Sequence, residues 1–198
     1  MKWSVIDKKI RYHGFFKLTE IKLQHELYAG GQSPFLTREL IDRGQAVAVL
    51  PYDPVRDELV LIEQFRIGAA EDKTGPWLIE IIAGYTEAGE SAEDVVHREA
   101  YEEAGCRLTD IESMYQFYSS PGGSSEQVQI FFARTDSADI KGIHGLDDEG
   151  EDIRVHVISS QQVFDWLDNG KIDSAMPIIA IQWFRLNRDR IREKWLSS

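Results

Sequence analysis

The segment from Gly84 to Cys106, GYTEAGESAEDVVHREAYEEAGC, constrains the fold more than any other part of the chain. Residues 91–104 contain no Gly or Pro and are rich in Ala and Glu, which predicts a helix. Ser91 can cap its start, and Gly105 is the type of residue that ends a helix. The sequence therefore predicts one helix with a defined beginning and end shortly after Gly84.

Three glutamates share one face of this predicted helix. Glu99, Glu102 and Glu103 are spaced i, i+3 and i+4, and like charges at that spacing repel by roughly 0.2–0.5 kcal/mol per pair. A cation among them would remove the repulsion. Carboxylates suit Mg²⁺ or Mn²⁺, whereas zinc prefers nitrogen and sulfur, and Mg²⁺ sites usually include substrate phosphates. Arg98 can orient the glutamates and offset part of their repulsion. The alternative is a solvated acidic helix face.

The spacing of this segment resembles the signature of the Nudix hydrolases, G-x5-E-x7-R-E-U-x-E-E-x-G-U, where U is a bulky apolar residue. All seven fixed letters are present, at Gly84, Glu90, Arg98, Glu99, Glu102, Glu103 and Gly105. Ala100 and Cys106 are smaller than the usual U residues, which affects packing more than chemistry.

The resemblance implies roles for individual residues of the segment. It implies catalytic roles for Arg98, Glu99 and Glu103. It implies metal ligation by Glu99, Glu102 and Glu103 together with the backbone carbonyl of Ala83. Ile82 stands where this family often has proline, a change that leaves the Ala83 carbonyl in place.

Periodicity and turn residues predict the other elements. Strands are expected at residues 3–11, 15–28, 35–41, 45–51, 58–66, 77–83, 111–119, 127–133 and 153–158, and further helices at 161–169 and 175–195. This order of elements predicts an α+β fold. The Nudix resemblance implies an α/β/α sandwich with a mixed sheet over residues 45–198, preceded by a small β extension over residues 1–44.

The loop SSPGGSSE, residues 119–126, contains a proline fifteen residues after Cys106. Taken alone it is an ordinary hairpin turn. A Ser-Pro-Gly loop at this place resembles the ADP-ribose pyrophosphatase branch of the Nudix family, in which the loop shapes the substrate pocket. That resemblance implies substrate contacts for Ser120 and Glu126.

A second loop, residues 143–152, packs five carboxylates into six positions. A solvated acidic loop is the simple interpretation. Within the Nudix resemblance it corresponds to the loop that delivers a catalytic base to the metal cluster. Matching the branch pattern implies that the base is Glu149. Glu151 is the second candidate for the base, and the resemblance implies that it ligates the metal.

The resemblance implies further substrate contacts outside the two loops. Arg66, at the end of a predicted strand, matches a family position at which an arginine meets substrate, and Tyr85 follows Gly84. Arg38 can clamp a diphosphate, and Phe15 can stack on adenine or else pack in the core. In the ADP-ribose pyrophosphatases the N-terminal extension is exchanged between subunits, which implies a homodimer in which Phe15 and Arg38 serve the partner's site.

Composition limits the remaining possibilities. The net charge of −12 argues against a nucleic-acid partner, and no apolar run approaches the roughly 18–20 residues needed to cross a membrane. The single cysteine excludes an internal disulfide and suits the cytoplasm. The basic residues of the last predicted helix are interpreted as a solvated face.

We therefore expect a Mg²⁺-dependent enzyme, with Mn²⁺ as a possible substitute, that hydrolyses ADP-ribose to AMP and ribose 5-phosphate. The alternative in the same class is hydrolysis of another nucleotide sugar such as GDP-mannose. A non-catalytic ADP-ribose sensor would be expected to have lost box glutamates, and a purely structural domain would leave the carboxylate cluster unexplained.

Overall fold

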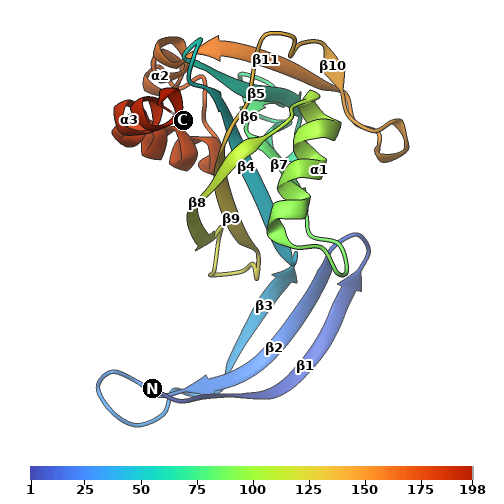
Figure 1. The fold of residues 1–198 in the computed structure, drawn as a ribbon. Helices are drawn as coiled ribbons and strands as arrows, with labels where there is room; N and C mark the ends of the chain where they lie inside the picture. Colours follow the sequence, from blue (N-terminus) through green and yellow to red (C-terminus); the bar gives the residue numbers. More distant parts are fainter. Residues whose placement is uncertain (198) are drawn as a thin grey trace. The chain divides into compact units, whose positions relative to one another are not determined.

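The computed structural model describes residues 1–197, which form two compact units (Figure 1). The first unit comprises residues 1–45 together with 117–128. The second comprises residues 46–116 together with the chain from Gln129 onward. Each unit is described separately below.

The first unit contains a three-stranded antiparallel sheet in the order β1-β2-β3. Its strands are β1 (Trp3–His13), β2 (Lys17–His25) and β3 (Leu36–Asp42). All eleven residues of β1 are exposed, including large apolar side chains. The predicted strand 15–28 is shorter in the structure, because residues 14–16 form the bend between β1 and β2.

The loop at residues 119–126 is hydrogen-bonded to the end of β3. The amide of Ile41 donates to the carbonyl of Gly123 at 2.8 Å, and the amide of Ser125 donates to the carbonyl of Ile41 at 3.0 Å. These bonds attach the loop to the N-terminal sheet, although about 80 residues separate the two in the sequence.

An eight-stranded sheet has the order β10-β11-β5-β4-β9-β8, with β6 paired to β5 and β7 paired to β4. Its strands are β4 (Gln45–Asp53), β5 (Glu58–Phe65), β6 (Trp77–Glu80), β7 (Ile82–Tyr85), β8 (Thr109–Tyr118), β9 (Gln127–Arg134), β10 (Ile143–His144) and β11 (Ile153–Ser159). The prediction of one strand over residues 77–83 was wrong. The segment divides at Ile81, because its first half pairs with β5 and its second half with β4.

Three helices cover this sheet, with α1 (Ala92–Ala104) on one face and α2 (Ser160–Asp168) and α3 (Ala175–Leu196) on the other (Figure 1). Short 3-10 helices, η1 (Ile67–Ala69) and η2 (Asp147–Glu149), lie in loops. Under α1 the core is mostly aliphatic, with Phe131 its one aromatic side chain among the described residues, and includes buried side chains of β4, β5, β7, β9 and β11. The expected α+β sandwich is confirmed.

The opposite core, beneath α3, is aromatic. Phe132 stacks on Trp195 with ring centroids 5.1 Å apart and on Phe184 at 5.4 Å, and Tyr52 meets Phe184 at 4.8 Å. All four side chains are buried. This cluster fixes α3 against the sheet, on the side away from α1.

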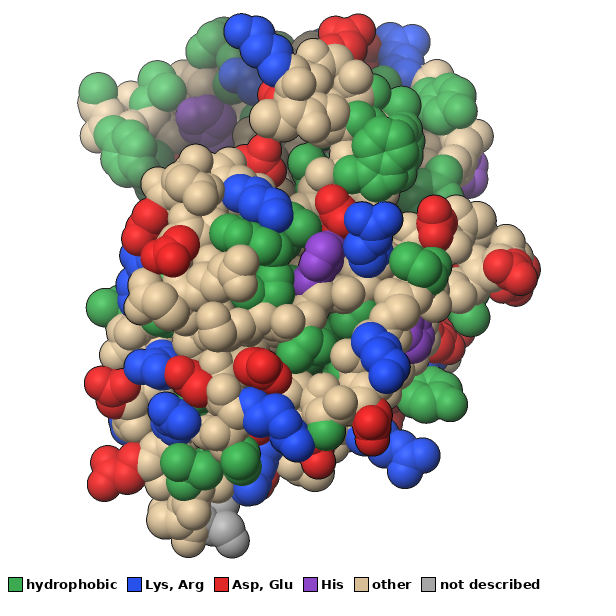
Figure 2. All heavy atoms as spheres, turned by 90° about the horizontal axis from the view of Figure 1, so that it is seen from above, with side chains coloured by type: hydrophobic (Ala, Val, Ile, Leu, Met, Phe, Trp, Pro, Cys, Tyr) green, Lys and Arg blue, Asp and Glu red, His purple; other side chains and the backbone are tan. Residues whose placement is uncertain are grey.

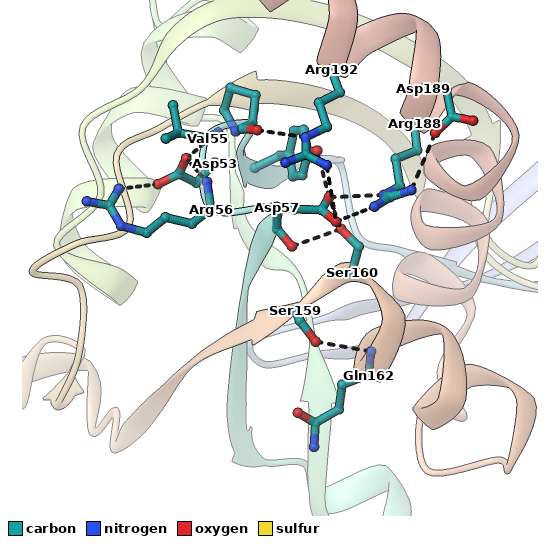
Figure 3. Close-up of polar contacts among 12 residues, drawn as sticks. Asp53, Val55, Arg56, Asp57, Ser159, Ser160, Gln162, Arg188, Asp189 and Arg192 are labelled. Atoms are coloured by element: carbon teal, nitrogen blue, oxygen red, sulfur yellow. Dashed lines mark hydrogen bonds and ion pairs between the residues drawn. The ribbon is translucent and has the colours of Figure 1, made fainter. Parts of the chain in front are cut away.

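The interpretation of the basic α3 residues as a solvated face was wrong for Arg188 and Arg192. Both reach the turn between β4 and β5, where Arg188 pairs with Asp57 and Arg192 donates to the carbonyl of Pro54 at 2.9 Å (Figure 3). Asp57 also accepts bonds from the hydroxyls of Tyr52 and Ser160. Burial favours the neutral acid, but these bonds outweigh it and lower the pKa of Asp57.

The buried carboxylate of Asp53 stabilises the same turn by accepting hydrogen bonds from its residues. Its Oδ1 accepts the amides of Val55 at 2.8 Å and Arg56 at 3.0 Å, and its Oδ2 accepts from the Arg56 guanidinium at 2.6 Å and from Ser137 (Figure 3). Burial would raise the pKa of Asp53, yet the donated bonds prevail and lower it from 3.8 to about 2. The turn at Asp53-Pro54 is thus held by a buried, ionised carboxylate.

The surface carries mixed charge. On the face drawn in Figure 2, basic and acidic side chains are interspersed, and neither sign forms a continuous area. Within residues 1–197 no helix combines the length and apolar character that a membrane crossing requires.

Candidate active site

The helix that carries the predicted glutamates is fixed at both ends. Ser91 and Asp94 form a reciprocal capping box, in which the Asp94 amide donates to the Ser91 hydroxyl and the Ser91 amide donates to the Asp94 carboxylate. Gly105 ends the helix with φ of 63°. The start and the end of α1 are therefore set by local sequence, and its buried apolar face sets which way the glutamates point.

Glu99 lies directly against the backbone of Gly84. A Cβ atom at position 84 would stand 1.6 Å from Oε1 of Glu99, a distance that no side chain can tolerate. Glycine is needed here for Glu99 to keep this position, because a Cβ at residue 84 would displace its carboxylate. The first letter of the sequence signature therefore makes room for one of its carboxylates.

Arg98 bonds to three carboxylates at once. Its Nε donates to Glu90 Oε1 at 2.9 Å, and its Nη1 donates to Glu99 Oε1 at 2.7 Å and to Glu102 Oε2 at 3.2 Å. Its Nη2 donates to the carbonyl of Tyr85 at 3.3 Å. The bond from Arg98 lowers the pKa of Glu90. Arg98 thus holds the glutamates in fixed directions and neutralises part of their charge.

Glu103 is the most buried carboxylate of the group, with 2% of its surface exposed. Its Oε2 accepts a bond from the amide of Ala83 at 3.0 Å. Burial raises the pKa of Glu103 well above its usual value, and the negative charges of Glu99 and Glu151 raise it further. Among the described residues, none of the basic side chains forms an ion pair with Glu103.

The acidic loop is attached to the C-terminal end of α1. The amide of Gly145 donates to the carbonyl of Glu102 at 3.2 Å, and the ring of His144 lies over Gly105. Within this loop Glu151 accepts the amide of Leu146 at 3.1 Å. Glu149 is exposed in η2, and its carboxylate makes no hydrogen bond or ion pair with any part of the chain that the structure describes. Of the two candidates for the base, Glu151 is fixed by a hydrogen bond and Glu149 is not.

The donor set suits a hard divalent cation. Glu99 and Glu103 are oxygen donors, burial raises the pKa of both, and the charge of Glu151 acts on both. Within residues 1–197 no three acidic, histidine or cysteine side chains yet converge on a single point. Glu99 and Glu102 are turned toward Arg98 instead. A cation of charge +2 would satisfy the buried, mutually repelling carboxylates.

Arg66 stands just after β5 and is held by Glu80. Its Nε donates to Glu80 Oε2 at 2.8 Å, and Gln64 Nε2 donates to the same oxygen at 3.5 Å. Glu80 is 5% exposed. The positive charge of Arg66 acts on Glu103, where it partly opposes the rise in pKa. Arg66 is therefore close enough to the carboxylate group for its charge to act on Glu103.

Tyr85, at the end of β7 in the second unit, accepts a hydrogen bond from Nη2 of Arg98 through its carbonyl. The remaining predicted substrate contacts lie in the first unit. Phe15 is 87% exposed and meets Phe16 edge-on at 4.8 Å, so it does not pack in a core. Arg38 is exposed on β3 and donates to the carbonyl of Thr37. The carbonyl of Ser120 accepts the amide of Ser124 within the loop at 119–126.

Glu126 is buried in the first unit and forms an ion pair that the sequence did not indicate. Its Oε1 lies 3.2 Å from Nε of Arg43, whose guanidinium lies over the ring of Phe16 at 4.6 Å. Sequence reasoning missed Arg43, because residues far apart in sequence supply its partners. It also missed Glu80, although a carboxylate in the apolar run WLIEII was a visible signal.

Comparison with known proteins places the chain in a family. The model of the NUDIX domain matches residues 42–177, which include the capped helix, the carboxylates and Arg66. The chain belongs to the NUDIX family. This NUDIX protein is 46% identical over 192 residues to the ADP-ribose pyrophosphatase of Escherichia coli (strain K12), covering 97% of this chain and 92% of that protein.

Other relatives share this similarity to different extents. The ADP-ribose pyrophosphatase of Haemophilus influenzae is 45% identical over 198 residues, covering 98% of this chain and 91% of that protein. The GDP-mannose pyrophosphatase of Enterobacter sp. (strain 638) is 30% identical over 190 residues, covering 94% and 97%. A crystal structure of an ADP compounds hydrolase shares the fold, with a TM-score of 0.74, 21% identity and 97% of each chain covered.

Proposed function

We propose that this NUDIX protein hydrolyses the pyrophosphate bond of ADP-ribose to AMP and ribose 5-phosphate, with Mg²⁺ as cofactor and Mn²⁺ as a possible substitute. The carrying observation is the buried carboxylate group of Glu99 and Glu103, held against Gly84 and Ala83. Near-full-length similarity to two ADP-ribose pyrophosphatases supports the substrate.

Five positions would hold the metal in this proposal, and they supply oxygen donors from α1, the acidic loop and β7. They are Ala83 through its carbonyl, Glu99, Glu102, Glu103 and Glu151. When bound, a divalent ion neutralises the diphosphate oxygens and so favours attack on phosphorus. Arg98 fixes Glu99 and Glu102 in place, since its guanidinium bonds to both.

The catalytic base in this proposal is Glu149. Its carboxylate is exposed and unpaired among residues 1–197, so it is available to take the proton of the attacking water. Glu151 is already bonded to the amide of Leu146, which suits a fixed ligand better than a mobile base.

The proposal includes substrate contacts by residues outside the carboxylate group. Arg66, whose outer nitrogens bond to none of the described residues, and Arg38 would bind the diphosphate. Phe15 would stack on adenine, which its exposure allows. Tyr85, Ser120 and Glu126 would contact the ribose or phosphate groups. The single, buried cysteine supports the further proposal that the protein works in the cytoplasm.

We propose that the protein is a homodimer formed by its N-terminal extension, residues 1–44. Every residue of β1 is exposed, and large apolar side chains lie along it, including Trp3, Ile10 and Tyr12. An exposed apolar edge strand is a template for pairing with another chain. In such a dimer Phe15 and Arg38 would serve the partner's active site.

A second candidate substrate is GDP-mannose, favoured by the 30% identity to a GDP-mannose pyrophosphatase over nearly the full chain. The chemistry and the metal site would be unchanged. Only recognition of the base and the sugar would differ.

Product release decides between these substrates. The protein is incubated with ADP-ribose, GDP-mannose, NADH or diadenosine polyphosphates in Mg²⁺, each with an EDTA control. We expect Mg²⁺-dependent release of AMP from ADP-ribose at a rate well above the others. Faster cleavage of GDP-mannose would replace the substrate, and tight binding of ADP-ribose without cleavage would indicate a sensor.

A further inference from the structure

We propose that Glu80 is a positioning residue that anchors the guanidinium of Arg66 and presents it to the diphosphate of the substrate. This inference rests on the proposed function, because it assumes that Arg66 binds the substrate. It assigns the buried carboxylate of β6 to recognition of the substrate rather than to the metal.

The sheet places Glu80 and Arg66 on one face. Glu80 lies opposite Ile62 in the pairing of β5 and β6, and side chains alternate along a strand. Ile62, Gln64 and Arg66 therefore point to the same side as Glu80. Ile62 is part of the core under α1, so this is the face that α1 covers with Glu99 and Glu103.

The contact between the two side chains leaves one end of Arg66 open. Nε is bonded to Glu80 at 2.8 Å, whereas Nη1 and Nη2 make no hydrogen bond with the described residues 1–197. The Arg66 side chain is 41% exposed and that of Glu80 is 7% exposed. A buried carboxylate thus holds Nε of the guanidinium. The two outer nitrogens belong to a half-exposed side chain and bond to none of the described residues, so they are available for a bidentate phosphate contact.

Glu80 also resolves a competition for Arg66. The positive charge of Arg66 already acts on Glu103, which lies among like-charged carboxylates. An unanchored arginine would be drawn into that group, where it would neutralise ligands of the cation and lose its contact with substrate. A dedicated carboxylate keeps Arg66 at the edge of the group and reduces the side-chain entropy lost when phosphate binds.

The test is a double-mutant cycle on Glu80 and Arg66. Glu80→Gln keeps the volume and removes the charge, and Arg66→Gln removes the guanidinium. We expect Glu80→Gln alone to raise KM for ADP-ribose about tenfold, with kcat changed less than about threefold. In the Arg66→Gln background the same substitution should change KM less than about twofold, because the group through which Glu80 acts is gone.

Glu63→Gln is the matched control. Glu63 also pairs with a basic residue, Arg154, but lies on the opposite face of β5, so its loss should leave KM unchanged. If Glu80→Gln does not fold, Glu80→Asp keeps the buried charge and retracts it from Arg66, and should raise KM similarly.

Binding of the α,β-methylene analogue of ADP-ribose, measured by calorimetry for every variant, separates the two hypotheses. Wild-type protein that binds this analogue without cleaving ADP-ribose contradicts the proposed function, and the cycle in Kd still tests Glu80. Equal effects of Glu80→Gln in both backgrounds, or an unchanged KM and Kd in folded Glu80→Gln or Glu80→Asp, would overturn the role of Glu80.

Discussion

At the scale of single residues, the contact between Gly84 and Glu99 shows how a backbone requirement and a chemical one are joined. A methyl group at position 84 would occupy the space of the Glu99 carboxylate. Glycine is therefore needed for the position of a side chain fifteen residues away, while its own backbone angles are ordinary.

Gly84→Ala tests this dependence. We expect the carboxylate of Glu99 to be displaced and turnover of ADP-ribose to fall by about a hundredfold, the order associated with misplacing a reacting group by an ångström. Steady-state kinetics measure the loss. Gly68→Ala, where the added methyl meets nothing within 4 Å, is the control. Equal turnover of the two variants would contradict the argument.

Glu103→Gln should affect turnover and thermal stability differently. We expect turnover to fall by several orders of magnitude. The melting temperature in EDTA should stay level or rise, since burial and the charges of Glu99 and Glu151 oppose ionisation of Glu103. Calorimetry and kinetics on the same samples check both parts. The matched variant Glu93→Gln, on the exposed side of α1, should change neither, and near-normal turnover of Glu103→Gln would refute the metal site.

Sequence reasoning predicted the residues of α1 and its caps, because their spacing is local and each residue type has a local role. It missed the pairs Arg66–Glu80 and Arg43–Glu126. The first pair joins segments separated by the loop between β5 and β6, and the second joins residues that lie 83 positions apart in the sequence. Only the pairing of strands brings such partners together.

At the scale of elements, α3 is joined to the turn between β4 and β5 by both apolar and ionic contacts. Aromatic side chains pack its buried face against the sheet. Arg188 donates to the carboxylate of Asp57, and Arg192 donates to the carbonyl of Pro54. Asp57 holds a positive φ of 60°, a conformation that the surrounding bonds stabilise. The sequence predicted the helix, but not its contacts with the turn between β4 and β5.

Arg188→Met should therefore lower the free energy of unfolding by about 1–3 kcal/mol, the usual cost of removing a hydrogen-bonded charged partner from a half-buried carboxylate. Urea denaturation measures the change. Turnover at saturating substrate should be unaffected, because the turn lies on the side of the sheet away from α1. Arg190→Met, which removes only a bond to Asn187, should cost much less; a similar loss in both variants would argue against this role of Arg188.

The carboxylate of Asp53 in the same turn should make the free energy of unfolding depend on pH in the acid range. The pKa of Asp53 is about 2 in the folded protein, against about 3.9 in an unfolded chain, so its ionised form stabilises the fold by on the order of 2 kcal/mol above pH 4. A lowered pKa means that this contribution is lost as pH falls from about 4 to about 2. The difference in unfolding free energy between wild type and Asp53→Asn should shrink across that window. A difference independent of pH would contradict the assignment.

At the scale of the whole molecule, the exposed strand β1 points to assembly. Ile10→Lys places a charge on an apolar position of that strand that is 62% exposed, and such a charge opposes pairing with a second chain. We expect light scattering to report a dimer for wild type and a monomer for the variant, with reduced hydrolysis of ADP-ribose. Lys8→Gln on the same strand should remain dimeric. A variant that is monomeric and fully active would refute the sharing of active-site residues.

Most of the fold was predictable, because the alternation of strands and the capped helix are written in local sequence. The division of residues 77–83 into β6 and β7 was not, since Ile81 looks like any other residue of an apolar strand. The division depends on which neighbour each half finds, β5 or β4. It also determines where Glu80 and Ala83 stand, so the part hardest to predict lies beside the proposed chemistry.

The chain has a single thiol, Cys106, which is 2% exposed, and burial raises its pKa to about 12. Such a thiol is protonated and shielded at neutral pH, so maleimide and methanethiosulfonate reagents should leave the native protein unmodified. Site-directed labelling therefore does not require replacement of Cys106 first. A cysteine introduced at Tyr28, which is 99% exposed, would carry a spin label whose partner in a second subunit reports the distance between the two chains directly.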